Sequence, residues 1–167
     1  MTENEVLLCP VKADTENKKT ILFVCTGNTC RSPMAASIFN HIFTELPYRA
    51  VSAGLTANGE PISKNAIHVL MERGILPTPE NDYTSHVSRT VDRDILAEAD
   101  LVVGITSSHA MNLMFAFPEF ASRISVMPRD ISDPFGGDVA VYRKTLEDIE
   151  SALREAFAVG GTKKDGE

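Results

Sequence analysis

One short segment combines a nucleophile, a cation and a turn. Cys25 is followed six positions later by Arg31, and Gly27 and Asn28 lie between them. Glycine and asparagine tolerate positive φ, so successive backbone N–H groups can turn toward a common centre and form an anion-binding concavity. The planar guanidinium of Arg31 can contact two phosphoryl oxygens at once. This spacing therefore predicts a loop that binds a phosphoryl group beside a cysteine.

The residues after this loop predict that Cys25 is ionised. Ser32 and Pro33 are typical of a helix start, with Ser32 as N-cap and Pro33 at the first helical position. A helix N-terminus and a nearby cation lower the pKa of a thiol from about 8.5 to between about 3.5 and 7.5. The Ser32 hydroxyl is placed to donate to the thiolate, so we expect Cys25 to be an in-line nucleophile. The alternative is a buried structural cysteine followed by a surface arginine. The expected phosphate- or substrate-binding residues of the loop are Thr26, Gly27, Asn28, Thr29, Cys30 and Ser32.

Apolar runs that alternate with amphipathic stretches predict the elements that position this segment. Four apolar runs predict strands at residues 21–24, 50–53, 101–105 and 124–127. Apolar residues at helical spacing predict helices that begin at Ser32 or lie at residues 63–73, 90–99 and 108–117. Asp138 is expected to cap a last helix.

The alternation of strands and helices predicts one α/β domain. We expect a four-stranded parallel sheet in the order 2-1-3-4 with helices on both faces. Ligands bind such sheets outside the carboxyl ends of the strands, so the end of the first strand, at Cys25, is the expected site. We expect the folded domain at residues 20–159, a flexible N-terminal extension at 1–19 and a flexible tail at 160–167.

Composition excludes several classes of partner. The net charge of −7 disfavours nucleic acid and anionic membrane surfaces, which would be repelled. No apolar run approaches the ~20 residues that span a bilayer, and residues 1–20 lack the apolar region of a secretory signal. Three cysteines without such a signal indicate reduced thiols and a cytoplasmic protein. The histidines and cysteines do not have the spacing of metal ligands, so we expect neither a metal site nor a cofactor. Three of the histidines are expected to be plain helix residues: His41, His68 and His109.

Residues 24–35 resemble the signature of low-molecular-weight protein tyrosine phosphatases, and the likeness covers nearly all of residues 21–157. Within that family the sequence is most similar to the bacterial protein arginine phosphatases. Thr29 stands where typical tyrosine-specific members carry Ile or Leu. Residues 133–137, Asp-Pro-Phe-Gly-Gly, stand where many tyrosine-specific members have Asp-Pro followed by two Tyr. The region of residues 105–109 is also similar to the arginine branch.

The resemblance implies roles for residues outside the loop. Asp133 is expected to be the general acid for the leaving group and then the base that activates water against a cysteinyl-phosphate, although Asp-Pro is also common turn chemistry. Phe135 is expected to wall the substrate slot; the alternative is a loop aromatic folded onto the core. Asn28, Ser52 and His86 are expected to form the network that holds the loop. An exposed loop histidine is the alternative for His86.

Cys30 lies on the same small loop as Cys25. Under oxidation the two sulfurs can close a disulfide that protects the nucleophile from irreversible oxidation. The alternative for Cys30 is a small packed cysteine. Cys9 lies outside the region of resemblance, so we assign it no role.

Two kinds of phosphorylated protein are possible substrates within the family. In either case we expect phosphate or a related oxyanion to bind in the site. Phosphotyrosine needs a deep aromatic cleft, whereas phosphoarginine favours polar contact and a nearby carboxylate. Thr29 is a smaller, partly polar wall and Gly136 removes an aromatic wall, so the sequence favours phosphoarginine. Arsenate reductases share the loop but need further cysteines, and none of residues 31–167 is a cysteine. A phosphocarrier domain would need neither Arg31 nor a dedicated acid.

Overall fold

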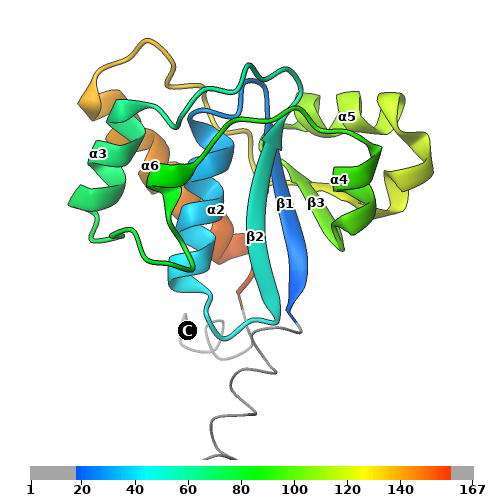
Figure 1. The fold of residues 1–167 in the computed structure, drawn as a ribbon, viewed down its shortest axis with the longest axis horizontal. Helices are drawn as coiled ribbons and strands as arrows, with labels where there is room; N and C mark the ends of the chain where they lie inside the picture. The colour runs from blue at the N-terminus through cyan, green and yellow to red at the C-terminus, as the bar shows by residue number, and fades with distance from the viewer. Residues whose placement is uncertain (1–17, 159–167) are drawn as a thin grey trace, which may run out of the picture.

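The computed structural model describes residues 18–158, in which strands and helices alternate along the chain (Figure 1). The strands are β1 (Lys19–Cys25), β2 (Tyr48–Gly54), β3 (Leu101–Gly104) and β4 (Ile124–Val126). The α-helices are α2 (Arg31–Ile42), α3 (Lys64–Glu72), α4 (Arg93–Glu98), α5 (Ser107–Ala116) and α6 (Val139–Ala156). Two short 3-10 helices are η1 (Tyr83–Ser85) and η2 (Pro118–Arg123). The predicted strands are confirmed, with small differences at their ends.

All pairs of neighbouring strands are parallel, and the order β2-β1-β3-β4 confirms the predicted sheet. The chain passes from β1 to β2 on one side and later returns to β3 on the other side. The carboxyl end of β1 is therefore a topological switch point, where parallel sheets leave a crevice for ligands. Cys25 is the last residue of β1 and pairs with Gly54, while Val24 pairs with Gly104.

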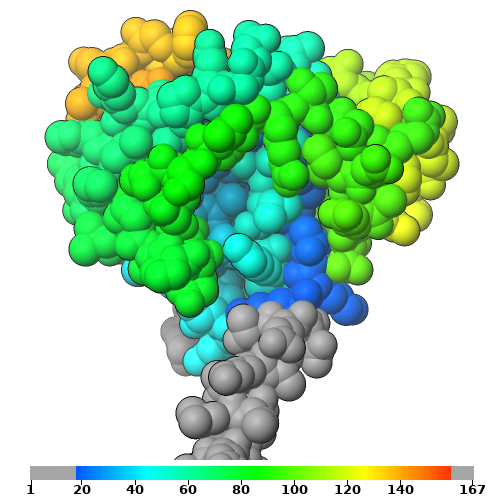
Figure 2. Space-filling view, viewed as in Figure 1, coloured from blue at the N-terminus to red at the C-terminus, as the bar shows by residue number. Residues whose placement is uncertain are grey.

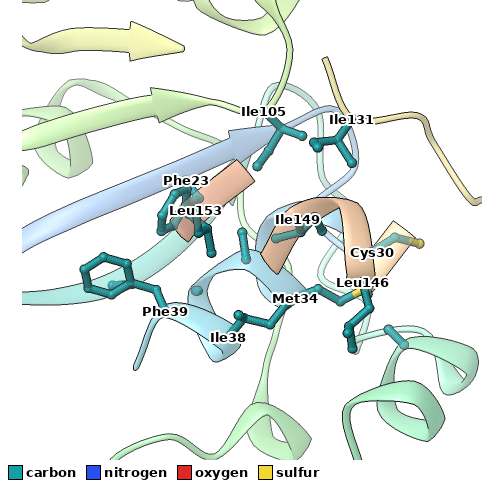
Figure 3. Packing of buried hydrophobic residues seen from close by; sticks show 14 of the residues in the cluster. Phe23, Cys30, Met34, Ile38, Phe39, Ile105, Ile131, Leu146, Ile149 and Leu153 are labelled. Atoms are coloured by element: carbon teal, nitrogen blue, oxygen red, sulfur yellow. The ribbon is translucent and has the colours of Figure 1, made fainter. Parts of the chain in front are cut away.

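Helices cover both faces of the sheet because alternate side chains of β1 enter two separate cores. Phe23 belongs to the core on the side of α2 and α6, together with Met34, Ile38 and Ile149, and Figure 3 shows it beside Leu153. Leu22 and Val24 belong to the second core, on the side of α4 and α5. Figure 1 shows α2, α3 and α6 on one side of the sheet and α4 and α5 on the other. Burial on both faces explains why β1 reads as a continuous apolar run.

The last helix, α6, fixes the end of the segment that carries Asp133. Asp138 is its N-cap, and its Oδ1 accepts a hydrogen bond from the backbone N–H of Val141 at 3.1 Å, as predicted. Tyr142, Leu146, Ile149 and Leu153 form its buried stripe. This stripe packs α6 against α2, the helix that follows the cysteine loop.

Two predicted helix starts are wrong for identifiable reasons. The first helix begins at Arg31, and its N-cap residue is Cys30, without a side-chain cap. Ser32 is therefore not the cap: it is fully buried in the first turn, where its hydroxyl lies 3.0 Å from the sulfur of Cys25. The helix predicted at residues 90–99 begins only at Arg93, because the Asp92 carboxylate caps it by accepting from the backbone N–H of Ile95 at 2.8 Å.

The expected N-terminal extension and C-terminal tail fall almost entirely on residues 1–17 and 159–167, which lie outside the described residues, as does Cys9. Their expected flexibility therefore stays a prediction. Among residues 18–158, none of the helices has the length and apolar character required to cross a membrane.

Candidate active site

The loop between β1 and α2, residues 25–31, is here called the phosphate loop. It joins the carboxyl end of a buried strand to the N-terminus of a helix, so both of its ends are fixed by the core. Cys25 is 3% exposed, and the Ser32 hydroxyl in the next helix lies 3.0 Å from its sulfur. This is the contact that the sequence predicts for a thiolate acceptor and a hydroxyl donor.

Asn28 decides in which direction that hydroxyl donates. Its Nδ2 donates to the hydroxyl oxygen of Ser32 at 2.7 Å and to that of Ser52 at 3.0 Å. Because Ser32 accepts this bond, its own hydrogen is free for the sulfur of Cys25, which lies closer than the alternative acceptor, the Ala53 carbonyl at 3.4 Å. The Asn28–Ser32–Cys25 chain therefore directs a hydroxyl hydrogen toward the sulfur of Cys25.

The sequence predicts a turn at Gly27 and Asn28 because both residues tolerate positive φ, and the structure confirms positive φ at Asn28 only. Its φ is 62°, in the left-handed region, whereas Gly27 is not among the residues with positive φ. Asparagine tolerates this conformation better than most residues, and its side chain is held here by three bonds. The third is made by the carboxamide oxygen, which accepts from the backbone N–H of Arg89 at 3.0 Å.

His86 joins the same network, as the resemblance predicts. Its Nε2 lies 2.7 Å from the carbonyl oxygen of Asn28, and burial lowers its pKa. The alternative of an exposed loop histidine is therefore wrong. Figure 2 shows the segment between α3 and α4 arching over β2 on this face, with a hollow beneath it. A cavity of about 350 Å³ there is lined by residues that include Ser52, His86 and Arg89.

Gly54 allows the phosphate loop to approach the sheet. The sequence predicts only that this glycine ends a strand. A Cβ at this position would lie 2.6 Å from the backbone oxygen of Thr26 and 3.0 Å from the Cβ of Asn28. The phosphate loop can therefore lie against β2 only because residue 54 has no side chain. The signal in the sequence, a glycine at the end of the second predicted strand, does not reveal which backbone approaches it.

Arg31 connects the phosphate loop to a second loop, residues 131–137, here called the acid loop. The Arg31 side chain is almost fully buried, and Nη1 donates to the carbonyl oxygen of Ile131 at 2.9 Å. Nη2 lies 3.6 Å from Oδ2 of Asp133. The Asp133 side chain is 54% exposed, and its Oδ1 accepts from the backbone N–H of Phe135 at 3.1 Å. Residues about a hundred positions apart thus meet at one end of a cleft.

The cleft between these loops has a volume of about 350 Å³. It is lined by Cys25, Thr26, Gly27, Asn28, Thr29, Cys30, Arg31, Thr56, Asn58, Glu60, Asp133 and Phe135. The Phe135 ring is 78% exposed, so the alternative of an aromatic folded onto the core is wrong. Thr56, Asn58 and Glu60 were not predicted, because nothing in their sequence indicates that the segment after β2 returns to the cleft.

Cys30 is packed and hydrogen-bonded rather than bonded to Cys25. Both cysteines are free thiols, and the sulfur of Cys30 lies 3.2 Å from the Tyr142 hydroxyl of α6. Burial and the contact with Cys30 raise the pKa of Tyr142 to about 12, so this hydroxyl stays protonated. The packed alternative therefore describes Cys30 in this structure, and disulfide formation under oxidation stays a prediction.

His109 is not the plain helix residue that the sequence predicts. It is buried in the first turn of α5, and its Nε2 lies 3.0 Å from the hydroxyl of Thr26 in the phosphate loop. The signal in the sequence is the Thr106-Ser-Ser-His109 spacing of a capping box, in which the N3 side chain folds back onto the N-cap backbone. That spacing reveals the fold of the turn but not its contact with Thr26.

Comparison with known proteins agrees with this geometry. Residues 20–165 match the family model described as low molecular weight phosphotyrosine protein phosphatase. The chain belongs to this family. A protein-arginine-phosphatase of Bacillus subtilis is 33% identical over 81% of this chain and 92% of its own, and that of Geobacillus stearothermophilus is 37% identical over 80% and 90%. Arsenate reductase 1 of Bacillus cereus is 34% identical over 87% and 98%.

Solved members of the family share the fold. A low molecular weight protein tyrosine phosphatase from T. tengcongensis superposes with a TM-score of 0.74 at 34% identity, covering 83% of this chain and 97% of its own. The YwlE arginine phosphatase from Geobacillus stearothermophilus superposes with a TM-score of 0.72 at 35% identity, covering 83% and 90%. Relatives named for three different substrates thus have similar identities, so membership of the family does not by itself select the substrate.

Proposed function

We propose that this protein is a cysteine-dependent protein phosphatase that hydrolyses phosphoarginine through a cysteinyl-phosphate intermediate. The observation that carries the proposal is the single cleft in which Cys25 faces Arg31 and Asp133. A nucleophile, a cation that can bind two phosphoryl oxygens and a proton donor for the leaving nitrogen then act on the same phosphoryl group. The partners are phosphorylated proteins, and the phosphoryl group binds in the phosphate loop.

In the first step the Cys25 thiolate attacks phosphorus from the side opposite the leaving group. The S–P bond forms as the N–P bond breaks, and Asp133 gives its proton to the departing guanidine nitrogen. Arg31 and the backbone N–H groups of the phosphate loop stabilise the charge on the phosphoryl oxygens. Asp133, now a carboxylate, accepts a proton from water as its oxygen attacks phosphorus. The S–P bond breaks, the thiolate of Cys25 is restored and phosphate leaves.

The cleft supports phosphoarginine over phosphotyrosine as the substrate. Glu60 and Asp133 supply carboxylates, which suit a planar, positively charged guanidine. Thr29 adds a partly polar wall, and Phe135 is the one aromatic residue among those that line the cleft. A flat tyrosine ring would find little apolar surface in this cleft. The names of the relatives from Bacillus subtilis and Geobacillus stearothermophilus point in the same direction.

Other reactions of the family have weaker support. A tyrosine phosphatase is the second candidate, favoured by the 34% identity to the T. tengcongensis enzyme. Arsenate reduction needs additional cysteines to relay a disulfide, and the free cysteines of the described chain are Cys25 and Cys30, both in the phosphate loop. A phosphocarrier would transfer phosphate without Asp133.

Turnover of two matched peptides tests the proposal. One peptide sequence is prepared with phosphoarginine and with phosphotyrosine, and release of inorganic phosphate is followed over many turnovers. We expect a higher kcat/KM for the phosphoarginine peptide. A much higher kcat/KM for the phosphotyrosine peptide would refute the substrate assignment, and a single stoichiometric transfer without phosphate release would indicate a carrier.

Substitution of Thr29 tests whether this residue selects the substrate. Thr29→Ile replaces a partly polar wall by an apolar one and is expected to shift the ratio of the two kcat/KM values toward phosphotyrosine. Thr29→Ser, which keeps the hydroxyl, is the matched control. An unchanged ratio in Thr29→Ile would exclude Thr29 as the discriminating residue while leaving the phosphatase proposal intact.

A further inference from the structure

The contact between His109 and Thr26 has no part in the mechanism above. Thr26 follows the nucleophile directly and lines the cleft, whereas His109 reaches it from α5, the helix that follows β3 in the chain. The distance between Nε2 of His109 and Oγ1 of Thr26 is 3.0 Å. His109 is only 4% exposed, so the imidazole is walled off from solvent and meets the cleft through this hydroxyl.

The backbone of α5 fixes the tautomer of His109. The N–H of Thr106 donates to Nδ1 at 3.1 Å. A ring nitrogen that accepts carries no hydrogen, so the hydrogen of the neutral ring is on Nε2. Burial, followed by the charge of Arg31, lowers the pKa of His109 to about 4, so the ring is neutral at neutral pH. Nε2 therefore donates to Thr26.

The donation from His109 determines what the Thr26 hydroxyl can do. A hydroxyl has one hydrogen and two acceptor positions, and His109 occupies one acceptor position. Within residues 18–158, His109 is the hydrogen-bond partner of this hydroxyl, so its hydrogen remains available on the cleft side. Thr26 lines the same cleft as Arg31 and Asp133. The charges of Arg31, Asp130 and Asp133 all act on the pKa of His109.

We propose that Thr26 donates its hydroxyl hydrogen to the water that hydrolyses the cysteinyl-phosphate, and that His109 is the positioning residue that sets this direction. The oxygen of this water has two lone pairs: one attacks phosphorus, and the other accepts the hydrogen bond from Thr26. The water proton passes to Asp133, and the S–P electron pair returns to Cys25. Thr26 and His109 keep their protons throughout. The inference rests on the proposed phosphatase mechanism and adds two residues to its second step.

Pre-steady-state kinetics separate this role from a general effect on the site. With p-nitrophenyl phosphate, the burst of p-nitrophenol reports formation of the cysteinyl-phosphate, and the steady-state rate reports its hydrolysis whenever a burst is present. Thr26→Val removes the hydroxyl and keeps the shape of the side chain. We expect its steady-state rate to fall about tenfold while the burst rate changes less than about twofold. Thr26→Ser should restore the steady-state rate.

His109→Asn tests the positioning residue. The Asn oxygen can still accept from the Thr106 N–H, as Nδ1 does, but the shorter side chain does not reach Thr26. We expect the same selective loss in the steady-state rate. Because His109 acts through Thr26, the Thr26→Val/His109→Asn double variant should be no slower than Thr26→Val alone. Thermal unfolding of each variant monitors the fold, and the Thr26 variants decide the question if His109→Asn does not fold.

The outcomes distinguish this inference from the proposed function. No release of p-nitrophenol by the wild-type protein would refute the phosphatase itself. Wild-type turnover combined with an unchanged steady-state rate in Thr26→Val would refute only the role of Thr26. Equal losses in burst and steady-state rates would also overturn it, because the hydroxyl would then act on the loop or on the first step. Additive losses in the double variant would overturn the coupling to His109.

Discussion

The phosphate loop and the acid loop face each other across one cleft but are built in opposite ways. In the phosphate loop, Asn28 is fully buried and its carboxamide makes three hydrogen bonds, to Ser32, Ser52 and the backbone of Arg89. In the acid loop, Phe135 is 78% exposed, and within residues 18–158 the Asp133 carboxylate is held by one backbone N–H and by Arg31 at 3.6 Å.

The proposed function accounts for this difference. In the proposed mechanism every substrate presents the same phosphoryl group, so donors held in a fixed geometry serve all of them. The leaving group differs between substrates, and its side of the cleft must admit a side chain attached to a protein. Arg31 joins the two loops through the Ile131 carbonyl, so the position of the acid depends on the rigid loop. Changes in the two loops should therefore have different consequences.

The largest expected effect comes from the nucleophile of the rigid loop. Cys25→Ser should lower kcat by at least about 10⁴-fold, because a serine hydroxyl is not ionised by the same surroundings. The ring of donors is unchanged, so binding of inorganic phosphate, measured by calorimetry, should stay within a few-fold of the wild type. Turnover close to that of the wild type would contradict the covalent mechanism.

The acid loop should show a smaller loss of activity without a loss of stability. Asp133→Asn removes the proton donor and should lower kcat by about 10²- to 10⁴-fold. The melting temperature should hardly change, because the carboxylate is more than half exposed. Asp138→Asn is the matched control: it removes a charge from the end of the same loop but preserves the N-cap, so its kcat should remain near the wild-type value.

The buried amide of the rigid loop should couple activity to stability. Asn28→Ala leaves a residue at φ 62° without its three hydrogen bonds and should lower the free energy of unfolding by about 2–4 kcal/mol. Urea denaturation measures this change, and kcat should fall with it. Asn58→Ala, at an exposed position that also lines the cleft, should change stability by less than about 0.5 kcal/mol. Equal effects at both positions would remove the contrast between the buried phosphate loop and the exposed rim of the cleft.

The smallest effect is expected at Phe135. Its ring is mostly exposed, so Phe135→Ala should change the free energy of unfolding by less than about 0.5 kcal/mol. The lost contact with the substrate should raise KM for a phosphopeptide about threefold to tenfold, while kcat is nearly unchanged. A fall in kcat comparable to that of Asp133→Asn would instead show that the ring positions the acid.

Much of the fold was predictable because its signals are local. The apolar run of residues 21–24, the glycines that follow strands and helices, and the Asp138 cap all act within a few residues. The wrong helix starts at Ser32 and at residue 90 also have local causes, since short polar side chains compete for caps and other partners. The sequence predicts two roles for the Ser32 hydroxyl, as the helix N-cap and as the donor to Cys25. In the structure it contacts the sulfur of Cys25, because the hydrogen bond from Asn28 leaves its hydrogen free for that sulfur.

The sequence by itself was enough to predict the chemistry proposed for this protein. Cys25, Arg31 and the turn between them are close in the chain, so their types and spacing suffice to predict a phosphoryl-binding thiolate, and the family resemblance adds Asp133. Tertiary structure decided which distant groups surround them: Glu60 in the cleft, Gly54 under the loop and His109 against Thr26. Such contacts depend on strand order and on close packing between elements, which no short-range pattern encodes.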